Sequence, residues 1–169
     1  MKRLILSAIV MCFAYFVNAQ GYETVADNNG SKMYLGFIHD SLLKTDTAFN
    51  WFAKAQNTYK QKEAVVKAFE ANKDSVNFLV FVGTWCPDSH YVIPRFFSIL
   101  DTVEFNKENV TMVAVDRTKQ DKNRLTHVLK VTNVPTIIVF KNGKELGRVV
   151  EYGETGRFDQ ELAALLTKS

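Results

Sequence analysis

Residues 78–89 read FLVFVGTWCPDS, an apolar run that passes directly into a glycine, a cysteine and a proline. A continuous run of residues that favour β structure predicts a strand buried on both faces of a sheet. Pro87 suits the first position of a helix, where its missing N–H costs nothing. Apolar residues then recur at helical spacing from Val92 to Leu100. The sequence therefore places Cys86 where a buried strand ends and a helix begins.

The rest of the C-terminal half alternates between strand and helix patterns. Further strands are predicted at residues 110–115, 134–140 and 146–150, and further helices near 125–129 and 158–166. Asn142-Gly143 separates the last two strands, and this pair tolerates the positive φ angles of a tight hairpin turn. The order from residue 78 is strand–helix, strand–helix, strand–strand–helix. This order predicts an α/β fold with a central mixed β-sheet flanked by helices.

Residues 20–74 precede this pattern and form an N-terminal extension that we expect to be irregular, or to contain a short strand, at first and then to be helical. Its first part mixes Gly, Asn, Asp and Ser with scattered apolar residues, and residues 33–38 are the strand candidate there. Residues 46–71 contain no proline or glycine and carry apolar residues at helical spacing. They predict one helix with a break near Asn57-Thr58, or two helices in succession.

Residues 1–19 have the layout of a secretory signal peptide. A basic start is followed by an apolar run from Leu4 to Val17 and by a small residue, Ala19, at the expected cleavage point. The run is shorter than the roughly 20 apolar residues that a membrane anchor needs, so an uncleaved anchor is the weaker alternative. We expect an exported protein, periplasmic or extracellular, that has no membrane association after cleavage.

Composition excludes several classes of protein. The formal net charge is +3 and no block of Lys or Arg stands out, so nucleic acid is not an expected partner. The two cysteines, Cys12 and Cys86, are too few for a disulfide framework, and signal cleavage would leave Cys86 alone. His39, His90 and His127 lie far apart in the sequence, and Cys86 with His90 makes only half a metal site. We therefore expect no metal and no cofactor.

Four features occur together in an order that resembles the thioredoxin family. They are Trp85-Cys86, a proline eight residues after that cysteine (Pro94), Val134-Pro135-Thr136, and the turn Lys141-Asn142-Gly143. The resemblance covers residues 75–169 and implies a thioredoxin-like domain, similar to secreted bacterial members with a Gly-Thr-Trp-Cys-x-Asp-Ser motif. It also implies a cis bond before Pro135, which faces Cys86 across a substrate groove. Trp85, Pro87, Val134 and Pro135 are then the expected substrate-binding residues.

The family motif is Cys-x-x-Cys, whereas this chain has Cys86-Pro87-Asp88-Ser89. Unpaired amides and the positive end of the dipole at a helix N-terminus stabilise a thiolate. The Ser89 hydroxyl could donate a further hydrogen bond to that sulfur. A lone thiolate forms a mixed disulfide but needs an outside thiol to release the product. We therefore assign catalytic roles to Cys86 and Ser89 in thiol–disulfide exchange of the isomerase or adduct-removing type. The expected partners are protein disulfides or thiols, together with a small thiol.

Other interpretations stay open from the sequence. The groove between Trp85 and Pro135 could serve a redox-inactive module that binds an extended peptide or a partner protein. A lone exported thiol could also link two chains as a Cys86 dimer. His90 is either a cation that supports the thiolate or an exposed residue of the first helical turn. Val80 stands where thioredoxins proper carry an acid, so the proton-handling equipment of a dithiol reductase is missing.

Overall fold

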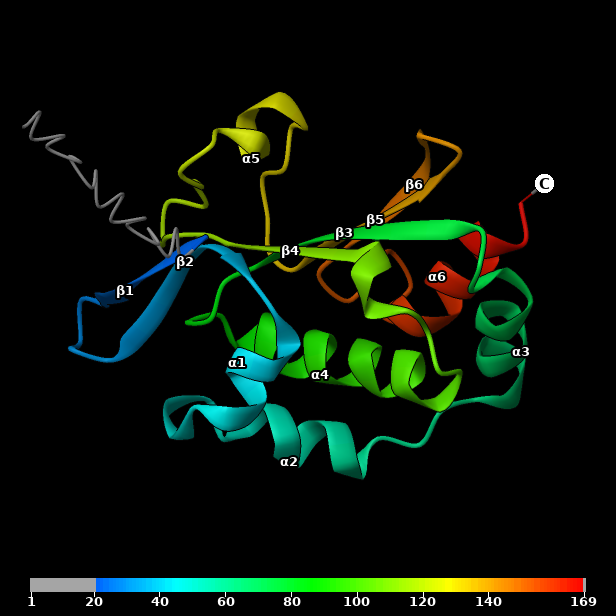
Figure 1. The fold of residues 1–169 in the computed structure, drawn as a ribbon, viewed down its shortest axis with the longest axis horizontal. Helices are drawn as coiled ribbons and strands as arrows, with labels where there is room; N and C mark the ends of the chain where they lie inside the picture. The colour runs from blue at the N-terminus through cyan, green and yellow to red at the C-terminus, as the bar shows by residue number, and fades with distance from the viewer. Residues whose placement is uncertain (1–20, 169) are drawn as a thin grey trace, which may run out of the picture.

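The computed structural model describes residues 21–168, so the predicted signal peptide at 1–19 lies outside the described residues. The strands are β1 (Tyr22–Ala26), β2 (Lys32–Ile38), β3 (Val76–Val82), β4 (Val110–Ala114), β5 (Thr136–Lys141) and β6 (Lys144–Val150). The helices are α1 (Asp40–Thr45), α2 (Trp51–Thr58), α3 (Glu63–Asn72), α4 (Pro87–Thr102), α5 (Leu125–Val128) and α6 (Phe158–Leu166), with short 3-10 turns η1 (Thr47–Phe49) and η2 (Lys107–Asn109). One sheet joins the strands in the order β1-β2-β4-β3-β5-β6 (Figure 1).

Strand β3 lies inside this sheet, between β4 and β5. It pairs parallel with β4, where Val80 faces Met112, and antiparallel with β5, where Val80 faces Ile137. Val80, Phe81 and Val82 are fully buried, as a continuous apolar run requires when both faces of a strand are covered. The predicted mixed sheet and its order of elements after residue 76 are confirmed.

The N-terminal extension is part of the same sheet. Strand β1 pairs antiparallel with β2, and β2 pairs antiparallel with β4, where Gly36 faces Ala114 and Ile38 faces Met112. The expected lead-in, irregular or with a short strand, named residues 33–38 as its strand candidate and so missed β1. This strand reads YETVA and is mostly exposed at the edge of the sheet, so it lacks the apolar alternation that identifies a half-buried strand in a sequence.

The predicted helical stretch at 46–71 divides into η1, α2 and α3. The interruption between the two longer helices covers residues 59–62, close to the predicted break at Asn57-Thr58. Helix α2 packs against α4, and α3 packs against α4 and α6. The extension therefore continues from the sheet into the helical layer below it (Figure 1).

Most helices cover one face of the sheet, and α5 stands alone on the other (Figure 1). The larger core lies beneath the first face, where Phe96 of α4 packs its ring against Phe69, Phe78 and Phe97 with centroid distances of 6.4, 5.1 and 5.5 Å. Burying an aromatic side chain of this kind contributes about 1.5–3 kcal/mol relative to leaving it exposed. Helix α4 is therefore held firmly against the sheet, with its N-terminus fixed at the end of β3.

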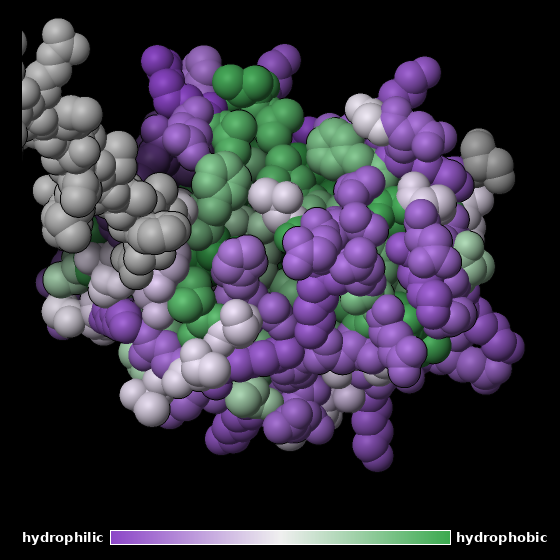
Figure 2. Space-filling model, viewed as in Figure 1, coloured by the Kyte–Doolittle hydropathy of each residue, from purple (hydrophilic) through white to green (hydrophobic). Residues whose placement is uncertain are grey.

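A smaller core lies on the opposite face. Phe81, Val113 and Ile138 project there from the central strands, next to Cys86 and Val134. In the view of Figure 2, hydrophobic residues reach the surface mainly near α5 and the adjoining sheet, and hydrophilic residues cover most of the helical layer. Among the described residues, no helix is long and apolar enough to cross a bilayer.

Candidate functional site

Cys86 is the residue that opens helix α4. Strand β3 ends at Val82, the Cys86 N–H donates to Gly83 O at 2.9 Å, and the His90 N–H donates to Cys86 O at 3.0 Å as α4 begins. Pro87 takes the first helical position and is exposed. The predicted strand-to-helix junction at Cys86 is confirmed. The sulfur is therefore attached at the end of a helix where backbone N–H groups lack intrahelical partners.

The loop before β5 brings a distant part of the chain to this sulfur. The Val134–Pro135 bond is cis, as the family resemblance implied. The Cys86 thiol donates to Val134 O, with an Sγ–O distance of 3.3 Å, although the two residues are 48 positions apart in the sequence. Val134 and Pro135 are both buried, and Cys86 is 7% exposed. The sulfur therefore lies against the cis-proline loop and is largely covered.

Ser89 makes a different hydrogen bond from the one predicted. It is fully buried, and among the described residues its hydroxyl oxygen accepts the Gly83 N–H at 3.2 Å. The expected hydrogen bond from Ser89 to the Cys86 sulfur is not among the hydrogen bonds of the described residues. A buried backbone N–H needs a partner where a strand ends, and the serine supplies it. Ser89 thus ties the end of β3 to the first turn of α4.

Trp85 lies half-buried beside the cysteine. Its indole N–H donates to Val115 O at 3.1 Å, and the guanidinium of Arg117 lies 4.9 Å from its ring centroid. Gly83 leaves room for this ring, because a Cβ at that position would come within 2.9 Å of Trp85 Cε2. The Trp85 ring is therefore fixed from the sheet side and from the loop that follows β4.

His90 is half-buried, so its expected exposure in the first helical turn was wrong. Its ring stacks on Trp51 of α2, with centroids 4.0 Å apart and an interplanar angle of 21°. Its Nε2–H donates to Thr84 O at 2.8 Å. Burial lowers the pKa of His90 below its ordinary value, and the bond to Thr84 only partly opposes this shift. A neutral His90 at pH 7 does not serve as a cation for the thiolate.

Two tyrosines that the sequence patterns did not indicate, Tyr91 and Tyr152, lie together next to the first turn of α4. The Tyr152 hydroxyl donates to Asp88 Oδ1 at 3.0 Å, and its ring lies 5.2 Å from that of Tyr91, centroid to centroid. Arg95 covers the Tyr91 ring at 3.7 Å. Burial and the Asp88 carboxylate raise the pKa of Tyr152. Tyr152 follows β6, so only closure of the sheet brings it next to Asp88, and no local motif could have identified it.

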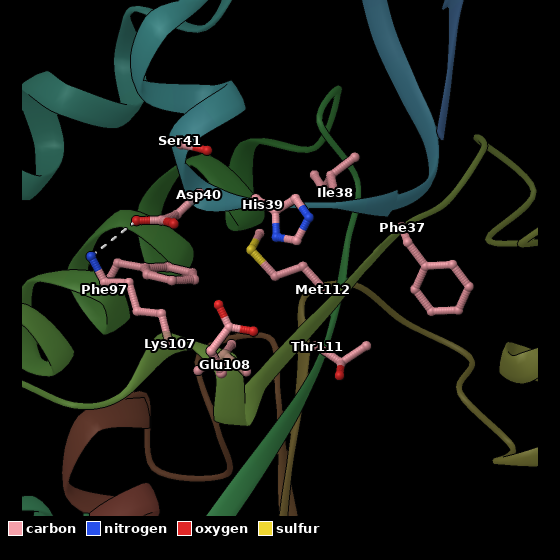
Figure 3. Close-up of a pocket in the computed structure, with 11 residues that line it drawn as sticks. Phe37, Ile38, His39, Asp40, Ser41, Phe97, Lys107, Glu108, Thr111 and Met112 are labelled. Atoms are coloured by element: carbon pink, nitrogen blue, oxygen red, sulfur yellow. Dashed lines mark ion pairs between the residues drawn. The ribbon is translucent and has the colours of Figure 1, made fainter. Parts of the chain in front are cut away.

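A separate pocket of about 330 Å³ lies between the end of β2, α1 and the beginning of β4 (Figure 3). Its rim includes an ion pair between Lys107 and Asp40 at 3.2 Å, and Met112 contributes to its lining. Strands β3 and β4 are parallel, and Cys86 follows the end of β3. The pocket therefore opens toward the other end of β4 and is not part of the Cys86 site.

The cysteine lies where a central strand of a mixed sheet passes into a helix, and a cis-proline loop faces it. This arrangement defines the class of α/β thiol–disulfide proteins. The chain belongs to the thioredoxin family, whose model matches residues 53–167. The match begins inside the predicted N-terminal extension and ends in the last residues of the chain. Members of this family act on protein thiols or disulfides.

Two relatives named thioredoxin agree with this assignment. One from Echinococcus granulosus is 38% identical over 101 residues, which cover 56% of this chain and 89% of the relative. One from Staphylococcus saprophyticus is 28% identical over 94 residues, which cover 53% of this chain and 86% of the relative. A solved protein of unknown function from Pseudomonas aeruginosa has a TM-score of 0.52 at 17% identity, covering 75% of this chain and 80% of its own, and shares the fold.

Proposed function

We propose that the protein carries out thiol–disulfide exchange through the single thiol of Cys86. A thiol–disulfide redox function follows from membership of the family. The placement of the Cys86 sulfur, 3.3 Å from Val134 O in the cis-proline loop, supports exchange at this thiol. Position 89 holds a buried serine, so a dithiol–disulfide cycle within the motif has no second sulfur. Substrates are protein disulfides or thiols, and release uses an outside thiol.

The exchange takes two substitution steps. The Cys86 thiolate attacks one sulfur of the substrate disulfide, a bond between Cys86 and the substrate forms, and the departing thiolate takes a proton from water. A second thiolate then attacks the mixed disulfide and releases Cys86. When that thiolate belongs to the same substrate, the disulfide is rearranged without net oxidation. For a substrate that carries a small-thiol adduct, Cys86 attacks the sulfur of the small thiol instead, and the substrate departs as a free thiolate. A second small thiol then attacks the disulfide between Cys86 and the first small thiol, so the two small thiols leave as their own disulfide and Cys86 is released.

We propose that this chemistry takes place outside the cytoplasm, in the periplasm or beyond the cell. The signal-peptide pattern of residues 1–19 supports this location. Proteins in such compartments form disulfides that need correction, which suits an isomerase or an adduct-removing protein.

Binding without chemistry is a second candidate, and the burial of the sulfur favours it. Cys86 is 7% exposed, and its S–H is already donated to Val134 O. A module of this kind would hold an extended peptide beside Trp85 and Pro135. It would keep its affinity when Cys86 is replaced by alanine.

The test uses the full chain with Cys12→Ala, so that Cys86 is its remaining cysteine. The protein is incubated with a peptide whose cysteine carries a small-thiol adduct, and intact mass is followed over time. We expect a mixed disulfide at Cys86 that disappears when excess small thiol is added, and none in a Cys86→Ala variant. Absence of the mixed disulfide, with peptide binding unchanged in Cys86→Ala, would favour the binding module. A non-reducing gel of the same samples reports a Cys86-linked dimer.

A further inference from the structure

Three contacts from the N-terminal part of the chain converge on residues 83–90, the segment that carries Cys86. We infer that Asp27 is a positioning residue for the site: it holds Arg117, and Arg117 holds the Trp85 ring beside the reactive thiol. The inference rests on the proposed exchange at Cys86. It gives the β1–β2 hairpin, which lies before the part that the family model matches, a role in the chemistry.

The first contact is a two-point ion pair. Asp27 follows β1 and is 7% exposed. Its two carboxylate oxygens accept Arg117 Nε and Nη2, each at 2.5 Å. A paired geometry of this kind fixes the plane of a guanidinium as well as its position. The hydrogen bonds from Arg117 also lower the pKa of the Asp27 carboxyl, and those to Asp27 raise the pKa of Arg117.

The fixed guanidinium acts on Trp85. It lies 4.9 Å from the centroid of the Trp85 ring, while the Trp85 indole N–H is bonded to Val115 O. The ring is thus held at its edge by the end of β4 and on its face by Arg117. Among the described residues, the Arg117 side chain has hydrogen bonds and an ion pair with Asp27 alone. Without Asp27, the plane of its guanidinium would therefore not be fixed.

Two further contacts join the N-terminal part of the chain to residues 83–90. The Tyr34 N–H of β2 donates to Thr84 Oγ1 at 3.1 Å, and Thr84 is buried. Trp51 of α2 stacks on His90, whose ring donates to Thr84 O. Each contact joins the N-terminal part to a residue within four positions of Cys86. The Asp27 contact is the one that reaches the exposed side of the site, where a substrate approaches.

A neighbouring ion pair provides a matched control. Glu23 of β1 pairs with Lys122, so it also links the hairpin to the loop after β4. The side chains of Glu23 and Lys122 are each about half exposed. Among the described residues, neither has a hydrogen bond or ion pair with Trp85. Glu23→Gln removes an ion pair between the same two segments without touching the Trp85 ring.

The experiment compares Asp27→Asn, Arg117→Gln, the double variant and Glu23→Gln in the full chain with Cys12→Ala. Arg117 is partly exposed, and far-UV circular dichroism checks that every variant folds. The first readout is hydrogen exchange of the Trp85 indole N–H by NMR, assigned with Trp51→Phe. The second is the rate of mixed-disulfide formation with the peptide described above.

We expect Asp27→Asn and Arg117→Gln each to expose the Trp85 indole to exchange and to slow mixed-disulfide formation, both roughly tenfold, because small displacements of a positioned group cost rate steeply. The double variant should be no slower than the slower single variant, since both act through one contact. Glu23→Gln should stay within about twofold of the parent protein. Unchanged indole exchange in both single variants, or additive losses in the double variant, would overturn the inference. A parent protein that forms no mixed disulfide refutes the proposed function instead, and the indole exchange still decides whether Asp27 positions Trp85.

Discussion

At the scale of single residues, the site depends on what surrounds one sulfur. Cys86 meets the start of α4 on one side and Val134 O on the other. Ser89 occupies the position of a second cysteine but serves the backbone, because its hydroxyl accepts the Gly83 N–H. In the proposed exchange, release is therefore left to a thiol from outside the chain.

Replacing this serine by cysteine should change the fate of the mixed disulfide. Residues three apart in a helix lie on the same face, so Ser89→Cys puts a second thiol within reach of the Cys86–substrate bond. We expect the lifetime of the mixed disulfide, measured by intact mass, to fall at least about tenfold, since an intramolecular attack replaces a bimolecular one. An unchanged lifetime would show that position 89 points away from the sulfur that must be attacked.

Ser89→Ala is the matched control for that change. It removes the acceptor of the buried Gly83 N–H and adds no thiol. We expect a loss of about 1–3 kcal/mol in the free energy of unfolding, the cost of an unsatisfied buried amide, and a mixed-disulfide lifetime like that of the parent protein.

At the scale of elements, the β1–β2 hairpin is the part that sequence patterns described least well. Gly36 lies in the middle of β2 with φ at +109°, where it faces Tyr22 of β1 and Ala114 of β4. A Cβ at this position would come within 2.5 Å of Gly21 O. Glycine is therefore required for the two strands to approach each other here.

Gly36→Ala should destabilise the protein more than a glycine change elsewhere in the same hairpin. Gly30 also has a positive φ, at +80°, but a Cβ there meets nothing within 4 Å. We expect Gly30→Ala to cost about 1–2 kcal/mol from the left-handed backbone alone, and Gly36→Ala to cost more because the backbone of β1 must also shift. Urea unfolding of the two variants measures the difference, and equal losses would contradict the close approach.

The elements differ in how well the sequence predicted them. Strand β3 was predicted because its apolar run is continuous, and helix α4 because its apolar residues recur at helical spacing. Strand β1 was not, because it is short, largely exposed and held by pairing with β2. Trp85, Cys86 and Pro135 were predicted from a motif. The pairing of Asp27 with Arg117 and the stacking of Trp51 on His90 were not, because contacts across 90 and 39 residues leave no local pattern.

At the scale of the whole molecule, the N-terminal part of the described residues contacts the segment of residues 83–90. The N-terminal strands add to the sheet at β4, and the helical layer carries Trp51 to His90. A change in His90 therefore affects the contact between the helical layer and residues 83–90. Its protonation links the stability of the fold to pH.

Stability should decline as the pH falls below about 6.5 because of His90. Burial lowers the pKa of His90 in the folded protein below the ordinary value of 6.5. The unfolded chain then binds the proton more readily, so this contribution to stability is complete above pH 6.5 and is lost as the pH falls through the folded value. We expect the free energy of unfolding to drop between pH 7 and pH 5, with a smaller drop in His90→Gln. Urea titrations at pH 7, 6 and 5 give both slopes, and parallel slopes would contradict a buried neutral imidazole.

The accessibility of the Cys86 sulfur in the folded protein is the central question. The direct measurement is the reaction of the folded Cys12→Ala chain with an aromatic disulfide probe, followed by the release of its coloured thiolate and by intact mass, with and without urea. We predict one adduct per chain at Cys86 without denaturant, formed faster than with free cysteine at the same pH. A thiol that stays unreacted until urea unfolds the protein would contradict thiol–disulfide exchange at Cys86. That result would favour the binding module instead.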